Sequence, residues 1–194
     1  MPRWLPYRHL CMDIFQKNDN NRKQAIVDAS SAIILFKAGL FGRLAQTYRL
    51  LMTASVLSEV TRSGYPGSEF FRDMGRRRAI TIMSCDGRTA TRCPRAMRLQ
   101  LLDPGERDTI ACFKEGRADF IIIDDGRGSG FCRDNGLPFI NALLFPRILF
   151  LSGRFSAAVC EKKTARIIEC GRYSQRIIAS AGTMGLRELQ LFLP

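Results

Sequence analysis

The chain has 194 residues, of which 46% are hydrophobic and 25% charged. This size and composition predict a single globular domain and argue against a disordered, collagen-like or membrane protein. No apolar run approaches the roughly 18 residues of a membrane helix, and residues 1–22 lack the apolar core and cleavage site of a secretory signal. We therefore expect a cytoplasmic location with no membrane association.

The charge balance points to a polyanionic partner. The formal net charge is +12 at pH 7, and most of the positive residues are arginine, whose planar guanidinium group suits phosphate. The alternative is a solvated basic surface that binds nothing. The seven cysteines are scattered without a CxxC pair, so we predict neither a zinc site nor a disulfide framework. His9 is the only histidine, so catalysis in the main domain is expected to use carboxylates, hydroxyls and arginines.

Apolar runs alternate with helical segments along the chain. Residues 1–23 are polar and without periodicity, which predicts a loose arm. The predicted strands cover residues 25–28, 50–53, 79–83, 119–123 and 138–140. The predicted helices between them cover residues 31–40, 55–61, 68–77 and 105–115. Buried parallel strands read as continuous apolar runs, so we predict a three-layer α/β/α sandwich with a short central parallel sheet of four to five strands.

After residue 141 the sequence predicts helices only. These cover residues 142–151, 156–169 and 174–191. We divide the chain into the arm at residues 1–23, a domain at residues 24–155, and C-terminal helices at residues 156–194 that pack on or extend the same domain.

Acidic residues recur where the predicted strands end. In an open parallel sheet, ligands bind outside the carboxyl ends of the strands. Each of the acids follows a strand or stands near the first turn of a helix at this edge: Asp28, Glu59, Glu106, Asp108, Asp124 and Asp125. Clustered carboxylates repel one another unless a hard cation lies among them, and ligation by oxygen alone favours Mg²⁺ or Mn²⁺. Such an ion can activate water against a phosphodiester.

Each acid also has a structural explanation. Asp28 can serve as the N-cap of the following helix. Asp103 and Glu106 have capping-box spacing, with Pro104 at the first helical position. Asp124 and Asp125 can be a solvated strand end, and Glu59 an exposed helix residue. Taken singly these explanations equal or exceed the functional one, whereas the acids together favour a site.

The same residues resemble the motifs of PIN domains. The matching stretches are Ile26-Val27-Asp28-Ala29-Ser30, residues 53–60 ending in Glu59-Val60, residues 102–111 around Gly105-Glu106, residues 118–128 around Asp124-Asp125, and residues 135–140. Their order agrees with the family over residues 24–155. Two positions depart from the usual pattern, because the third acid is glutamate rather than aspartate and Asn141 stands where glycine is common.

This resemblance implies a PIN sandwich with a Mg²⁺- or Mn²⁺-dependent endoribonuclease site. It is closest to an uncharacterised PIN-like branch related to the VapC toxins of toxin–antitoxin pairs. RNA, a small antitoxin protein and a second copy of the chain are the implied partners. Carried over by position, the metal-site and catalytic acids are Asp28, Glu59, Glu106 and Asp125, supported by Asp124 and Asp108, with Ser30 as a hydroxyl that contacts the substrate.

Arginines near these acids are candidates for RNA contacts. Arg127 follows Asp125 by two positions, where it could contact a carboxylate or the scissile phosphate. Two arginine groups could line a groove for RNA or form a solvated face: Arg72, Arg76, Arg77 and Arg78, and Arg88, Arg92, Arg95 and Arg98. The alternative to a nuclease is a catalytically weak or inactive module that binds nucleic acid or a protein partner.

Overall fold

The sheet is entirely parallel. The computed structural model describes residues 22–84, 99 and 101–194. Its five strands pair in the order β3-β2-β1-β4-β5. They are β1 (Gln24–Val27), β2 (Arg49–Thr53), β3 (Thr81–Met83), β4 (Phe120–Ile122) and β5 (Phe139–Ile140). The predicted sandwich with a short parallel sheet is therefore confirmed.

Helices connect the strands and continue beyond the last one. Between the strands lie α1 (Ala29–Lys37), α2 (Phe41–Thr47), α3 (Ala54–Val60), α4 (Ser68–Arg76), α7 (Pro104–Lys114) and α8 (Gly126–Asp134). The C-terminal region contains η2 (Ala142–Leu144), α9 (Phe145–Leu151), α10 (Ala157–Cys170), α11 (Gln175–Thr183), α12 (Leu186–Leu189) and η3 (Gln190–Phe192). We predicted neither α2 nor α8, and the single helix expected at residues 174–191 is broken near Gly185, which precedes α12 as its N-cap.

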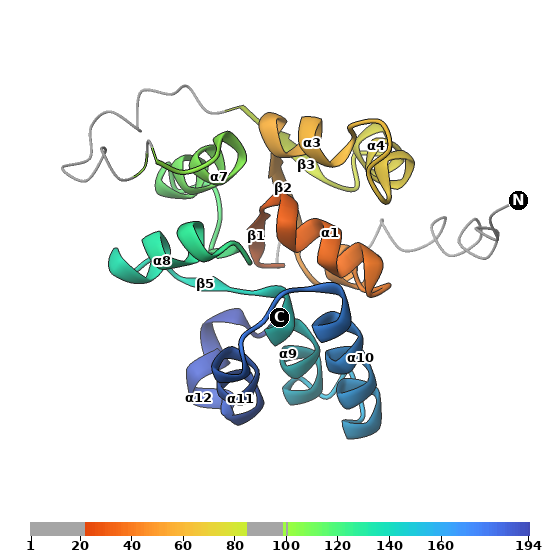
Figure 1. The fold of residues 1–194 in the computed structure, drawn as a ribbon, viewed down its shortest axis with the longest axis vertical. Helices are drawn as coiled ribbons and strands as arrows, with labels where there is room; N and C mark the ends of the chain where they lie inside the picture. The colour runs from red at the N-terminus through yellow and green to blue at the C-terminus, as the bar shows by residue number, and fades with distance from the viewer. Residues whose placement is uncertain (1–21, 85–98, 100) are drawn as a thin grey trace, which may run out of the picture.

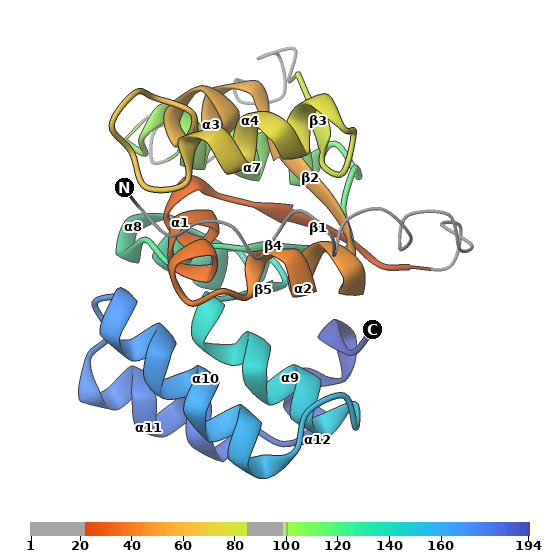
Figure 2. The ribbon, with the colours of Figure 1, turned by 90° about the vertical axis from the view of Figure 1, so that its right-hand side faces the viewer.

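The helices form layers around the sheet (Figure 1). Figure 2 shows α3, α4 and α7 above the strands, α1 and α2 below them, and α9 to α12 as a further group beneath. The strand order reverses between β1 and β4, because β2 and β3 follow on one side and β5 on the other. A reversal of this kind opens a crevice at the carboxyl ends of the two strands. This crevice is where the candidate site lies.

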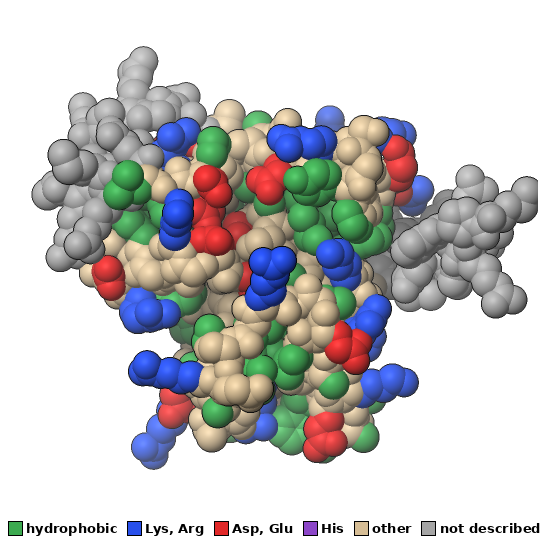
Figure 3. All heavy atoms as spheres, viewed as in Figure 1, with side chains coloured by type: hydrophobic (Ala, Val, Ile, Leu, Met, Phe, Trp, Pro, Cys, Tyr) green, Lys and Arg blue, Asp and Glu red, His purple; other side chains and the backbone are tan. Residues whose placement is uncertain are grey.

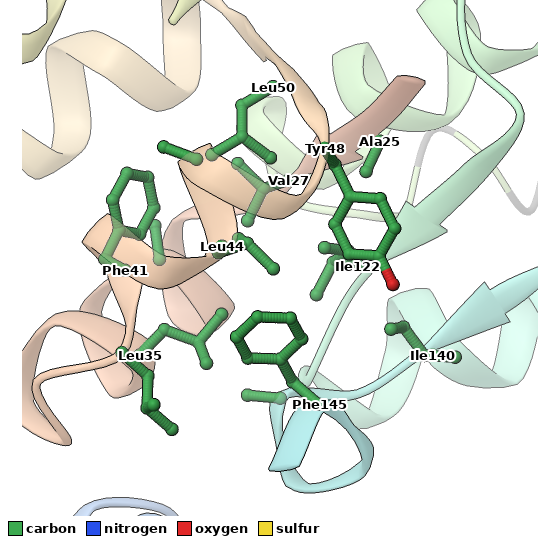
Figure 4. Packing of buried hydrophobic residues seen from close by; sticks show 14 of the residues in the cluster. Ala25, Val27, Leu35, Phe41, Leu44, Tyr48, Leu50, Ile122, Ile140 and Phe145 are labelled. Atoms are coloured by element: carbon green, nitrogen blue, oxygen red, sulfur yellow. The ribbon is translucent and has the colours of Figure 1, made fainter. Parts of the chain in front are cut away.

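Alternate strand residues serve two cores. Val27 and Ile122 belong to the larger core (Figure 4), which α1, α2, α4 and the C-terminal helices complete. Tyr48 is fully buried in this core, and its hydroxyl donates to Phe192 O at 2.5 Å. Ile26 and Ile121 face the smaller core under α7 and α8. Because Phe192 packs in the larger core, the C-terminal helices bury apolar surface together with the sheet.

Two further findings concern membrane-spanning helices and cysteines. Within residues 22–84, 99 and 101–194, no helix is long and apolar enough to cross a membrane. Cys132, Cys160 and Cys170 are free thiols, whereas Cys112 in α7 is disulfide-bonded, which the scattered cysteines did not predict. The predicted arm lies almost wholly outside the described residues.

Candidate active site

Asp28 lies at the junction of β1 and α1. Its backbone N–H donates to Ile122 O at 3.0 Å, which extends the pairing of β1 with β4. Its Oδ1 accepts from Ser31 N–H at 2.9 Å and its Oδ2 from the Ser30 hydroxyl at 2.6 Å. Asp28 is thus the N-cap of α1, and it is also 2% exposed at the carboxyl edge of the sheet. Asp28 therefore both caps α1 and lies at the predicted site.

Asp124 is a neighbouring acid that three donors hold in place. Its Oδ2 accepts from the Ser31 hydroxyl at 2.7 Å and from Ala142 N–H at 2.9 Å, while its Oδ1 accepts from the Tyr173 hydroxyl. Burial raises the pKa of Asp124, although these donors lower it, and its charge raises the pKa of Asp28. Asp124 therefore anchors Tyr173, which stands between α10 and α11, to the end of β4.

Asp28 and Asp124 form one carboxylate pair, linked by Ser31, and Glu106 and Asp125 form a second. Glu106 lies in the first turn of α7, where its Oε2 accepts from Asp103 N–H at 3.3 Å as the capping-box spacing predicted. Asp125 is the N-cap of α8, and its Oδ1 accepts from Arg127 N–H at 2.7 Å and Gly128 N–H at 3.4 Å. Glu106 is 7% exposed. Its Oε1 is buried without a hydrogen-bond donor in the described part of the chain.

The environment shifts the pKa values of these acids apart. Burial raises the pKa of Asp28 to about 7, against the hydrogen bonds from Ser30 and Ser31. Burial, and after it Asp125, raises the pKa of Glu106 to about 8, and the charge of Asp28 adds to this. Burial also acts to raise the pKa of Asp125, but hydrogen bonds and nearby charge outweigh it, so the pKa of Asp125 is lowered. At pH 7 Glu106 is accordingly the protonated member of its pair.

Glu59 lies across Gly105 from this pair. A Cβ placed on Gly105 would be 3.4 Å from Glu59 Oε2, which shows how closely α3 approaches the start of α7. Glu59 lines a cavity of about 200 Å³ together with Ser55, Ser58 and Arg62. In the described ranges no hydrogen bond joins Glu59 to another acid. The structure thus places Glu59 beside the carboxylate group rather than within it.

Asp108 and Arg127 differ in their relation to the site. Asp108 follows Glu106 by two helical positions, about 200° around α7, and its Oδ1 lies 3.7 Å from Arg107 Nε. The structure therefore does not bring Asp108 to the other acids. Arg127 is exposed, and its charge helps to lower the pKa of Asp125.

The predicted arginine groups are only partly described. In α4, Arg72 pairs with Glu69 and donates to Thr61 O at 2.6 Å, and Arg77 Nε lies 2.9 Å from an Asp73 carboxylate oxygen. The arginines of residues 85–98 lie outside the described residues. Figure 3 shows acidic side chains gathered where α3, α7 and α8 meet.

The sequence matches a known protein family over most of its length. A family model described as a PIN domain matches residues 24–145. The chain belongs to the PIN domain family. The match includes every strand and all the candidate acids, whereas α10, α11 and Tyr173 lie beyond it. Searches of curated proteins and of solved structures gave no significant match.

PIN domains are in general nucleases that typically use divalent metals. The question for this PIN domain is whether its acidic side chains can serve as ligands for such an ion. Asp28, Glu106 and Asp125 offer carboxylate oxygens, the hard donors that Mg²⁺ and Mn²⁺ prefer. The unpartnered Oε1 of Glu106 has lone pairs available for an ion. No group of three acids within the described residues is close enough to hold an ion as it stands. The donors fit in kind, and one or two carboxylates with water and phosphate oxygens are enough to hold Mg²⁺.

Two contributing residues were not predicted from the sequence. Ser31 links the acids, because its N–H binds Asp28 and its hydroxyl binds Asp124. Its position after the predicted strand end was a usable signal. Tyr173 gave no such signal, since it is 49 residues from Asp124 in the chain and follows no motif.

Gly128 of the PIN domain is expected to tolerate alanine poorly. A Cβ there would overlap Ile123 Cδ1 and lie 3.2 Å from Glu106 Oε1, so both side chains must shift. We expect Gly128→Ala to weaken Mn²⁺ binding on the order of tenfold, as loss of support around metal ligands does. Gly130→Ala is the matched control in the same helix, because no atom of the described residues would lie within 4 Å of its Cβ. It should stabilise the fold by up to about 1 kcal/mol. Equal Mn²⁺ affinity of the two variants, measured by calorimetry, would contradict the expectation.

Removal of the Tyr173 hydroxyl should loosen the C-terminal helices. Tyr173→Phe keeps the ring but deletes the hydrogen bond to Asp124, and bonds to charged groups contribute about 1.5–3 kcal/mol. We expect the free energy of unfolding in urea to fall by about that amount. Tyr65→Phe is the control, since Tyr65 is exposed and its ring lies under the guanidinium group of Arg62. A loss no larger than that of the control would show that the bond does not stabilise the fold.

Proposed function

We propose that this PIN domain is a metal-dependent endoribonuclease that hydrolyses RNA phosphodiester bonds. One observation carries the proposal: Glu106 Oε1 is buried and has no hydrogen-bond donor among the described residues, beside Asp125 and close to the buried Asp28. Burial without a compensating positive charge is the reason that Glu106 keeps its proton at pH 7. A divalent cation supplies such a charge at the sheet edge where ligands bind.

The proposed roles follow from the contacts. Asp28, Glu106 and Asp125 would hold the ion. Glu59 would contribute a further carboxylate to the ion from the adjoining cavity. A bound Mg²⁺ or Mn²⁺ stabilises charge on the phosphate and lowers the pKa of a coordinated water. Ser30 orients Asp28 through its hydroxyl, which can also contact substrate. Arg127 is exposed next to Asp125, where a guanidinium group can bind the scissile phosphate.

The substrate class and biological role are part of the same proposal. The net charge of +12 favours a polyanion, and the VapC-like motifs favour RNA. The kinship with VapC further supports a toxin that a small antitoxin neutralises and that acts as a homodimer. Induced expression should then arrest growth of a host cell, whereas expression of the Asp28→Asn variant should not. Growth arrest by both proteins would count against the toxin role.

The central test is cleavage of labelled single-stranded RNA by the purified chain. We expect internal cleavage with millimolar Mg²⁺ or Mn²⁺ and none in EDTA. Undiminished cleavage in EDTA would contradict a metal-dependent mechanism. A preparation of the Asp28→Asn variant made in the same way controls for contaminating ribonucleases.

A second candidate is a binding module whose acids only stabilise the fold. It is favoured by the absence of a three-acid cluster among the described residues and by the capping roles of Asp28, Glu106 and Asp125. Calorimetric titration with Mn²⁺ separates the two. Uptake that Asp28→Asn abolishes supports the nuclease, and no uptake at millimolar Mn²⁺ supports the module.

A further inference from the structure

A second cavity lies between α1 and α10, away from the acids. It has a volume of about 500 Å³, and cationic side chains from both helices line it. The charged residues around this α1–α10 cavity are Lys37, Lys162, Lys163, Arg166 and Glu169. Four cations against one acid give it a strongly positive lining.

The local structure leaves this positive charge available. Lys163 Nζ donates to Ala38 O at 3.4 Å and so joins α10 to the end of α1. Arg166 pairs with Glu169 at 2.6 Å, but both side chains are more than half exposed, so the pair contributes little. Lys37 and Lys162 make no ion pair within the described residues. Both lysines are exposed and can reach an anion in the cavity.

The cavity and the candidate active site are joined by α1. This helix begins beside Asp28 and Ser30 and ends at Lys37, and its nine residues span about 13 Å. Figure 3 shows basic side chains over α1 and α10 on the face that also carries the acidic group. A strand of nucleic acid that reaches the acids can therefore continue along α1 to the cavity.

We propose that the α1–α10 cavity binds a backbone phosphate of the RNA substrate, a few nucleotides from the scissile bond. The ligand chemistry is that of a phosphate group, which lysine binds as a point charge and arginine through its planar fork. No aromatic side chain among the described residues lines the cavity, so we expect it to contact the nucleic-acid backbone and not to stack bases. The proposal rests on the proposed nuclease function. It also gives a role to α10, which lies outside the matched residues 24–145.

The test measures RNA binding without cleavage. The full chain carrying Asp28→Asn is titrated in EDTA with a fluorescent single-stranded RNA, and the dissociation constant is followed against salt concentration. Adding Lys37→Gln and Lys162→Gln should weaken binding on the order of tenfold and make the salt dependence shallower by about 1.4, since each lost contact removes about 0.7. Arg176→Gln and Arg187→Gln form the control, because these exposed residues remove the same charge from α11 and α12.

Each outcome decides the proposal. A clear loss in the lysine variant with little change in the control supports it, as does weak competition by millimolar inorganic phosphate. Equal losses in both variants would overturn it, because only the general field would then matter. Displacement of RNA by inorganic phosphate at micromolar concentration would assign the cavity to a free anion, and tighter binding of an acidic peptide than of RNA would assign it to a protein. Failure of the wild-type chain to cleave RNA would contradict the proposed nuclease function but not the phosphate site, since these binding measurements use no metal.

Discussion

Asp28→Asn is expected to lower metal-dependent RNA cleavage by roughly a hundredfold or more and, at pH 8 without metal, to raise the melting temperature. The first effect follows because a catalytic ion contributes several kcal/mol to phosphate chemistry. The second follows because the pKa of Asp28 is raised to about 7 by burial, so the folded protein holds an unfavourable buried charge at pH 8. One pKa unit is about 1.4 kcal/mol, or about 3 °C for a chain of this size.

The geometry allows this exchange without loss of the cap. The asparagine oxygen can accept from Ser31 N–H, and the Ser30 hydroxyl can turn to accept from the new amide. Asp119→Asn is the control, since Asp119 is exposed and accepts from Gln24 N–H at 2.7 Å at the other end of the sheet. Cleavage assays and thermal melts of the three proteins give the comparison. Equal cleavage by Asp28→Asn and wild type would end the proposed role of Asp28.

The metal-free protein is expected to lose stability as pH rises from 5 to 8. In the folded state Asp28 and Glu106 have pKa values of about 7 and about 8, whereas in the unfolded chain both lie near 4. Between these values the folded state binds more protons than the unfolded state, so the free energy of unfolding falls as pH rises. The contribution of these two protonated carboxyl groups to the free energy of unfolding is complete below about pH 4 and lost above about pH 8.

Saturating Mn²⁺ should reverse this loss, because an ion binds the ionised carboxylates. Thermal melts at pH 5 and pH 8, with Mn²⁺ and with EDTA, should therefore show the larger metal-induced rise at pH 8. Glu106→Gln should flatten the pH dependence of the metal-free protein, since the glutamine does not titrate. A melting temperature that is equal at both pH values in EDTA, or a variant as pH-sensitive as the wild type, would contradict the raised pKa values.

The central strands could be predicted from the sequence because each is a continuous apolar run buried on both faces. Ile26 and Val27 show why, since they face different cores and are both fully buried. Helix α8 could not be predicted in the same way. Gly126, Gly128 and Gly130 give its first turns the composition of a loop, and the helix forms because Asp125 caps it and neighbouring side chains enclose Gly128.

The site was predictable as a set of acids but not as an arrangement. Chain order places Asp28, Glu106, Asp124 and Asp125 near one sheet edge, and the structure brings these four together in two pairs. Asp108 is turned away by helix geometry, and Glu59 lies on α3, in the adjoining cavity beside Gly105. Asp124 is held in part by the hydroxyl of Tyr173, whereas Asp125 caps α8. No local pattern could reveal a contact that joins residues so far apart in the chain.

The contacts of the last helices form late in biosynthesis. A nascent chain emerges with its N-terminal residues first, so all the acids leave the ribosome before Tyr173 and Phe192. Until then the carboxylate of Asp124 lacks its phenol partner, and the hydroxyl of Tyr48 lacks the carbonyl that it binds in the core. Lys23 likewise waits for Leu191 and Leu193, whose carbonyl oxygens its ammonium group contacts at 2.8 Å and 2.6 Å. The acidic site therefore gains the hydrogen bond from Tyr173 to Asp124 only after α10 has been synthesised, well after the last of the acids.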